Sequence, residues 1–140
     1  MQAIAITQGD PAGIGPEIVA KAFRDAPDVL RGCFAVGELV TLRRAAQCIV
    51  RPGMPQLPVA LIASPDEAWQ VPPRCLPVLQ LPGLPGPLPW GQVSAAAGRA
   101  AADFFLGGLA HAVHLERQAQ CNAGQRVVAV QHHMLGIDLG

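Results

Sequence analysis

The stretch that decides the fold is Ile6-Thr7-Gln8-Gly9-Asp10-Pro11-Ala12-Gly13-Ile14-Gly15-Pro16-Glu17-Ile18, close to the amino terminus. It joins the apolar run Ala3–Thr7, which predicts a strand, to a helical pattern that begins at Pro16. The glycines in between permit positive φ angles and close backbone approach, and proline suits the first turn of a helix. Such a turn brings the N–H groups of a helix start to a ligand, so the stretch indicates an α/β protein with an anion or nucleotide site.

The spacing of these glycines is not a common phosphate signature. Gly9, Gly13 and Gly15 fit neither G-x-G-x-x-G nor the P-loop, because no Gly-Lys-Ser/Thr follows. Spacing alone leaves two interpretations open: a turn shaped only by glycine geometry, or a ligand-binding loop. Asp10 is equally suited to capping the turn locally. Glu17 is expected to serve the helix dipole rather than catalysis.

Strand and helix patterns alternate along the chain. This alternation favours an α/β fold with a mixed or parallel sheet and flanking helices. Arg43 and Arg44 are expected on the solvated face of the second helix. The predicted elements are a helix from Pro16 to just before Pro27, a strand at Cys33–Val36, a helix from Glu38 to about Val50, and strands at Leu57–Ile62 and Leu76–Leu81.

A segment rich in proline and glycine interrupts this alternation at residues 82–91. Its four prolines and three glycines cannot continue a helix or a central strand, so we expect a surface connection. Ser94 then makes a suitable N-cap for a helix that runs to about His114. Glycines weaken the middle of this helix. Val127–Val130 predicts another strand. Residues 1–140 are interpreted as one incomplete α/β unit.

Composition excludes several functional classes. The chain has 140 residues, 51% hydrophobic, with zero net charge and a single lysine, so it offers no basic surface for nucleic acid. No apolar run is long enough to span a bilayer, and no signal peptide is visible, so we expect a cytoplasmic protein. Four scattered cysteines (Cys33, Cys48, Cys75 and Cys121) form no ligand spacing and are expected to be buried or half-buried thiols.

The histidines do not predict a metal site. His111 and His114 lie three residues apart and share a helix face, but two ligands do not close a zinc site. A solvated helix end is the more ordinary interpretation. His132 and His133 point to opposite sides if the chain is extended there.

Two segments together resemble the 4-hydroxythreonine-4-phosphate dehydrogenase family, which serves pyridoxal phosphate synthesis and related catabolism. The first is residues 6–18, quoted above. The second is Gly91-Gln92-Val93-Ser94-Ala95-Ala96-Ala97-Gly98-Arg99, which is similar to the family's G-x-x-S/D-A-x-x-G helix start. The resemblance covers roughly residues 1–130 and implies an incomplete isocitrate/isopropylmalate-dehydrogenase-like fold.

The resemblance implies a function as well. It points to an NAD- or NADP-dependent, metal-assisted oxidative decarboxylation of 4-phosphohydroxy-L-threonine or a related phosphorylated hydroxy acid, by a homodimer. In that wider fold the first turn lies beside the adenosine part of the cofactor. The implied cofactor-binding residues are Gly9, Asp10, Gly13, Ile14 and Gly15. No catalytic residue is assigned.

The carboxyl-terminal residues depart from the family pattern. After Val130 the family has a Thr-x-Pro-x-x-Lys turn and later a Gly-His-Thr-Glu motif, whereas this chain has Gln131-His132-His133-Met134. The resemblance therefore implies a chain truncated or disrupted after about residue 130, lacking the metal ligands, which is inactive alone and able to self-associate. The alternative is a non-catalytic α/β fragment or a nucleotide- or phosphate-binding module.

Overall fold

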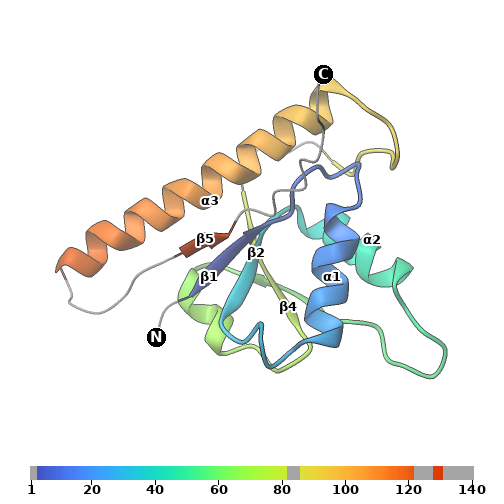
Figure 1. Ribbon diagram of the computed structural model, residues 1–140, viewed down its shortest axis with the longest axis horizontal. Helices are drawn as coiled ribbons and strands as arrows, with labels where there is room; N and C mark the ends of the chain where they lie inside the picture. The colour runs from blue at the N-terminus through green and yellow to red at the C-terminus, as the bar shows by residue number, and fades with distance from the viewer. Residues whose placement is uncertain (1–2, 82–85, 122–127, 131–140) are drawn as a thin grey trace, which may run out of the picture.

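The computed structural model describes residues 3–81, 86–121 and 128–130, and the side chains of residues 3–81 and 86–110. In this part of the chain, strands and helices alternate around one sheet (Figure 1). The elements are β1 (Ile4–Thr7), α1 (Gly15–Asp25), β2 (Cys33–Gly37), α2 (Leu39–Cys48), β3 (Val59–Ile62), a 3₁₀ helix η1 (Pro65–Trp69), β4 (Leu76–Gln80), α3 (Ala95–Cys121) and β5 (Val128–Val130).

The five strands form one sheet in the order β3-β4-β2-β1-β5, and each neighbouring pair is parallel. Ile4 of β1 pairs with Cys33 on one side and with Val128 on the other. The structure thus confirms the α/β prediction in its parallel form. Parallel strands are normally covered on both faces, and the order of the elements places helices on both.

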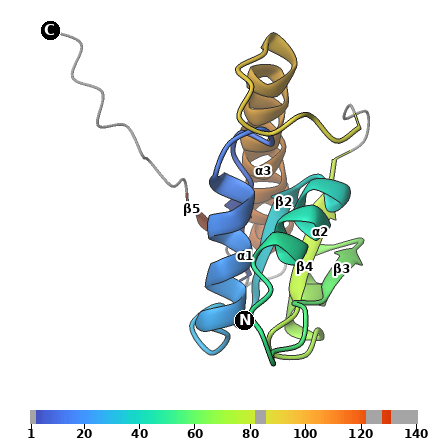
Figure 2. The same cartoon turned by 90° about the vertical axis from the view of Figure 1, so that its right-hand side faces the viewer.

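Two apolar clusters cover the two faces of the sheet. Residues alternate along β2, so that Cys33 and Ala35 join the cluster with α1 and α2, whereas Phe34 and Val36 join the other cluster. Figures 1 and 2 show α1 and α2 together over one face and α3 across the opposite face. The α1–α2 cluster draws on Val19, Ala20, Phe23, Leu42, Ala45, Ala46, Leu76 and Val78.

The long helix α3 begins as the sequence predicts. Ser94 Oγ accepts a hydrogen bond from the backbone N–H of Ala97 at 3.1 Å, which confirms Ser94 as the N-cap residue. Ala97, Ala100 and Phe104 are buried at helical spacing and form the stripe that faces the sheet. Phe104 is the largest side chain of this stripe, and only 1% of it is exposed.

The predicted end of α3 at His114 is also wrong, because the helix continues to Cys121. Residues 115–120 are good helix formers, and neither proline nor glycine occurs between His114 and Cys121. Gly107 and Gly108 lie within the helix where it meets the sheet: Gly107 contacts Leu81, and Gly108 lies beside Thr7 and Val36. The two glycines thus allow close packing instead of marking a weak point.

Two further elements differ from the predictions. Strand β3 starts at Val59 and not at Leu57, since Pro58 has no N–H group for the ladder. The 3₁₀ helix η1 was absent from the predicted pattern because it spans only five residues, which is too short for a periodic signal. Val128–Val130 is a strand as predicted, while Val127, His132 and His133 lie outside the described residues.

A buried arginine joins the ends of α1 and α2. Arg24 is 8% exposed; its Nη1 donates to the carbonyl of Ile49 at 2.6 Å, and its Nε and Nη2 each donate to the Asp25 carboxylate at 2.7 Å. These hydrogen bonds from Arg24 hold the pKa of Asp25 below its ordinary value, although partial burial opposes them. The same contact raises the pKa of Arg24.

Candidate functional site

The strand order places the loop after β1 where α/β sheets bind ligands. From β1 the chain winds through α1 to β2 on one side, whereas β5 lies on the other side of β1. Ligands in open parallel sheets bind outside the carboxyl ends of the strands at such a reversal. The glycine loop, defined here as residues Gln8–Gly15, begins at the carboxyl end of β1 and ends at the first turn of α1, so it is the candidate site.

The turn within the glycine loop is held by Asp10. Its Oδ1 accepts a hydrogen bond from the N–H of Ala12 at 2.8 Å, and its carbonyl accepts one from Gly13 at 3.1 Å. Gly9 has a φ of 73°, which glycine adopts without strain. Asp10 therefore caps the turn locally, as the alternative interpretation predicts.

Gln8 is central to the site, and sequence reasoning missed it. It is 1% exposed, its Oε1 accepts a hydrogen bond from the N–H of Glu38 at 2.8 Å, and its N–H donates to Val36 at 3.0 Å. A Cβ on Gly15 would lie 2.3 Å from the Gln8 carbonyl oxygen, and one on Gly37 would lie 2.3 Å from Gln8 Oε1. Both glycines are therefore needed so that backbone can pass closely around Gln8.

The exposed part of the loop faces outward at the start of α1. Ile14 is 61% exposed and Gly13 is exposed, while Pro16 is buried in the first turn. Glu17 in that turn forms an ion pair with Lys21 at 3.4 Å, in keeping with its predicted role in the helix. An anion at this end would meet the positive pole of α1 and its first N–H groups.

The start of α2 is occupied by side chains from the sheet. The N–H of Glu38 donates to Gln8, and the N–H of Leu39 donates to Gln80 Oε1 at 3.3 Å. Thr41 donates its hydroxyl to the buried Glu38 carboxylate. Because these contacts already satisfy the N–H groups of Glu38 and Leu39, the start of α1 is the better candidate for an anion.

A segment far away in the sequence touches the glycine loop. The N–H of Gly91 donates to the carbonyl of Ala12 at 2.8 Å. Next to it, the Arg44 guanidinium lies 3.9 Å from the centre of the Trp90 ring, and Arg44 Nη2 donates to the carbonyl of Leu88 at 2.9 Å. Arg43 is exposed as predicted, but the solvated position predicted for Arg44 is wrong.

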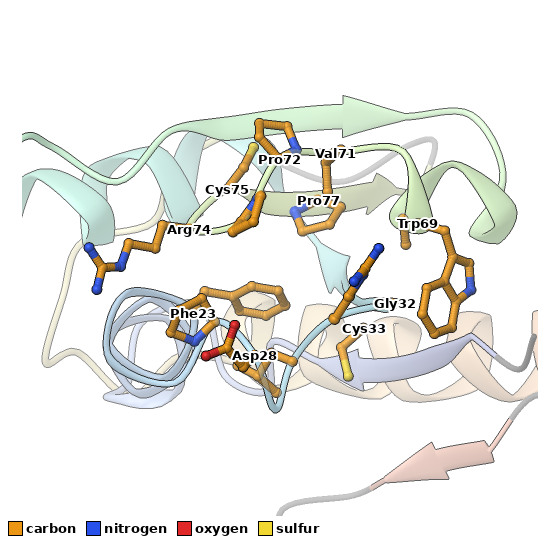
Figure 3. Close-up of a pocket in the computed structure, with 15 residues that line it drawn as sticks. Phe23, Asp28, Gly32, Cys33, Trp69, Val71, Pro72, Arg74, Cys75 and Pro77 are labelled. Atoms are coloured by element: carbon orange, nitrogen blue, oxygen red, sulfur yellow. The ribbon is translucent and has the colours of Figure 1, made fainter.

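A cavity of about 190 Å³ lies at the opposite, amino-terminal end of β2 and β4 (Figure 3). Phe23, Trp69 and Pro77 line it together with the charged side chains of Asp28 and Arg74. Cys33 and Cys75 also line it, and burial raises the pKa of both thiols, which keeps them protonated and weakly nucleophilic.

The cysteine prediction is confirmed only in part. Cys33 and Cys75 are buried free thiols, but Cys48 is exposed at the end of α2. Among the side chains that the structure describes, no three His, Cys, Asp or Glu groups come together to hold a metal ion. His111 and His114 lie within α3, and their side chains are outside the described set, as is that of Cys121.

No family model matches the chain. The 4-hydroxythreonine-4-phosphate dehydrogenase of Zymomonas mobilis is 32% identical over 124 residues, which are 88% of this chain and 33% of that protein. The crystal structure of the Klebsiella pneumoniae enzyme of the same name superposes with a TM-score of 0.69 at 33% identity, covering 81% of this chain and 34% of that chain.

The chain resembles an amino-terminal portion of these dehydrogenases. D-threonate 4-phosphate dehydrogenase of Salmonella typhimurium is also similar, with 37% identity over 87 residues, 49% of this chain and 27% of that protein. The chain spans about one third of the length of the curated relatives it matches. The resemblance stated from the sequence is therefore confirmed.

The five residues implied as cofactor-binding lie together in the glycine loop. Gly9 and Asp10 shape its turn, and Gly15 packs against Gln8. Gly13 and Ile14 provide its exposed surface. Their contact with a cofactor stays a prediction. No helix of the described residues is long and apolar enough to cross a membrane.

Proposed function

We propose that this chain supplies the glycine-loop part of the nicotinamide-cofactor site in a dehydrogenase for a phosphorylated hydroxy acid. 4-Phosphohydroxy-L-threonine is the substrate named for one group of relatives, and D-threonate 4-phosphate for another. The observation that carries the proposal is the loop's position, at the carboxyl end of the strand where the winding of the sheet reverses.

The residues of the loop fit a dinucleotide. The Cβ-free position at Gly15 lets the loop turn tightly around Gln8, and this leaves Gly13 and Ile14 exposed at the positive end of α1. We propose that the exposed edge of the loop contacts the adenosine and phosphate part of NAD or NADP. When bound, the cofactor would supply the hydride acceptor needed to oxidise the substrate alcohol.

The described side chains do not fit the divalent metal that the family resemblance implies. They include no group of three potential ligands, so we derive no metal-assisted step from them. The part of the reaction assigned to this chain is therefore binding and orientation of the cofactor.

Location and assembly belong to the same proposal. The described cysteines Cys33, Cys48 and Cys75 are free thiols, which is typical of reducing compartments and supports a cytoplasmic enzyme. Phe105, Leu106 and Leu109 expose apolar surface along α3, which supports self-association or a homodimer.

Calorimetric titration of the chain with NAD, NADP and inorganic phosphate tests the cofactor assignment. Ile14→Glu places a negative charge beside the proposed phosphate position and should weaken dinucleotide binding about fivefold, since one charge contact contributes on the order of 1 kcal/mol. Val29→Glu is the matched control, because Val29 is 80% exposed and lies away from the loop.

The titration distinguishes a dinucleotide site from a site for phosphate alone. Binding of NAD or NADP that Ile14→Glu weakens and Val29→Glu leaves intact supports the proposal. Binding of phosphate without either dinucleotide would favour the alternative, a phosphate-binding module. Wild-type chain that binds none of the three at millimolar concentration would overturn both.

A further inference from the structure

The connection between β4 and α3 is mostly exposed where the structure describes it, at residues 86–94. Leu88 and Trp90 are its half-buried residues, whereas Gly86, Pro87 and Pro89 are exposed. An exposed segment with so few apolar contacts has little to fix its position. Beside the hydrogen bond from Gly91 to Ala12, the contacts made by Leu88 and Trp90 fix where the connection lies.

Both of those contacts are made by Arg44. Its guanidinium stacks 3.9 Å from the centre of the Trp90 ring, and its Nη2 donates to the Leu88 carbonyl at 2.9 Å. Neither Arg44 Nε nor Trp90 Nε1 has a hydrogen-bond partner among the described residues, so stacking is what joins these two side chains. A planar guanidinium can stack and donate at once, which a lysine ammonium cannot do in the same geometry.

Gly91, the residue after Trp90, joins the connection to the glycine loop. The N–H of Gly91 donates to the Ala12 carbonyl at 2.8 Å, and Gly91 has a φ of 71°, which turns the chain toward α3. Ala12 is only 4% exposed. Figures 1 and 2 both show the connection passing beside the loop that precedes α1.

We infer that Arg44 is a positioning residue: by holding Trp90, it keeps Gly91 on Ala12 and so fixes the conformation of the glycine loop. Arg44 lies on α2 and does not belong to the loop that it positions. The inference rests on the proposed function only in that the positioned loop is the one proposed to bind the cofactor.

Amide hydrogen exchange without cofactor tests the positioning directly. Arg44→Ala and Trp90→Ala should each speed exchange by about tenfold, relative to β2 and β4, at the hydrogen-bonded amides of Gly91, Ala12 and Gly13. This is the factor expected for losing one such contact. Arg44→Lys should be impaired nearly as much. Arg43→Ala is the matched control, since Arg43 is the neighbouring exposed arginine of α2, and it should leave exchange unchanged.

A double variant that combines the two substitutions tests whether Arg44 and Trp90 act through one shared contact, even if one substitution lowers overall stability. Arg44→Ala with Trp90→Ala should loosen the loop no more than Arg44→Ala alone, because Arg44→Ala already removes the stacking contact with Trp90. Faster exchange that is uniform over the whole chain, or confined to Gly91 while the Ala12 and Gly13 amides stay protected, would overturn the inference.

A second readout separates this inference from the cofactor proposal. At a temperature where all variants are folded, Arg44→Ala should raise the Kd for NAD several-fold over that of Arg43→Ala. An unchanged Kd with a loosened loop would overturn the role of Arg44 in the site. If wild-type chain binds no NAD, the cofactor proposal fails, and hydrogen exchange alone decides whether Arg44 positions the loop.

Discussion

Replacing Gly15 with alanine tests the packing of the glycine loop most sharply. The new Cβ would lie 2.3 Å from the carbonyl oxygen of Gln8, well inside the distance at which a carbon and an oxygen touch. Gln8 cannot yield easily, since it is buried and hydrogen-bonded to Val36 and Glu38. The backbone of β1 or the start of α1 must therefore move.

The expected cost follows from two opposing effects. Forcing a methyl group into packed structure costs about 1–3 kcal/mol. Gly15 begins α1 and has an ordinary φ, so alanine recovers up to about 1 kcal/mol of helix propensity, and less at a helix end. The net loss of stability should be roughly 1–2 kcal/mol, or a fall in Tm of about 3–8 °C for a chain of this size.

Gly13→Ala is the matched control within the same loop. Its new Cβ would lie 3.4 Å from the Asp10 Cβ, and Gly13 does not have a positive φ, so the change should stay within about 0.5 kcal/mol. Thermal and urea unfolding of the three proteins, followed by circular dichroism, measure the difference. Equal stability of Gly15→Ala and wild type, or an equal loss in both variants, would refute the reasoning.

Three further predictions follow from the same structure. The purified chain alone should form no NADH above blank with 4-phosphohydroxy-L-threonine, NAD and a divalent metal, and metal-dependent turnover would contradict this. The chain should self-associate through the exposed side chains of α3, so Leu106→Glu with Leu109→Glu should shift light scattering toward monomer, whereas a stably monomeric wild type would refute the prediction. Because Arg24 lowers the pKa of Asp25 below its ordinary value of about 4, ionised Asp25 stabilises the fold above that pH, and this contribution is lost as the pH falls through the lowered pKa. Asp25→Asn should therefore make Tm depend less steeply on pH in the acid range. An unchanged slope would show that the contact contributes nothing to stability.

Features set by neighbouring residues were predictable from the sequence. The turn capped by Asp10 and the helix start capped by Ser94 each depend on a partner two or three residues away. The end of α1 follows from Pro27, which disfavours helix in the residue before it. The strands and helices up to β4 follow from apolar periodicity in the same local way.

Features set by distant residues were not predictable in this way. A glutamine after a strand looks like a loop residue, and nothing near Gln8 reveals that its partner is the N–H of Glu38, thirty positions away. Arg43 and Arg44 are neighbours in one helix pattern, which does not distinguish them. Arg44 is half-buried because Trp90, from another segment, covers it. The site's backbone loop was thus visible in the sequence, but the side chains that hold it were not.

The position of β1 in the sheet has a consequence for the synthesis of the chain. During synthesis, the first pairing partner of Ile4 to be made is Cys33, and the second, Val128, is made much later. At the ribosomal rate of about 5–20 residues per second, one edge of β1 waits roughly 5–20 s for β5 after β2 has emerged. During that interval an apolar parallel strand offers unpaired N–H and C=O groups to any other nascent chain, so the yield of soluble protein should depend on translation speed and on chaperones that shield this edge.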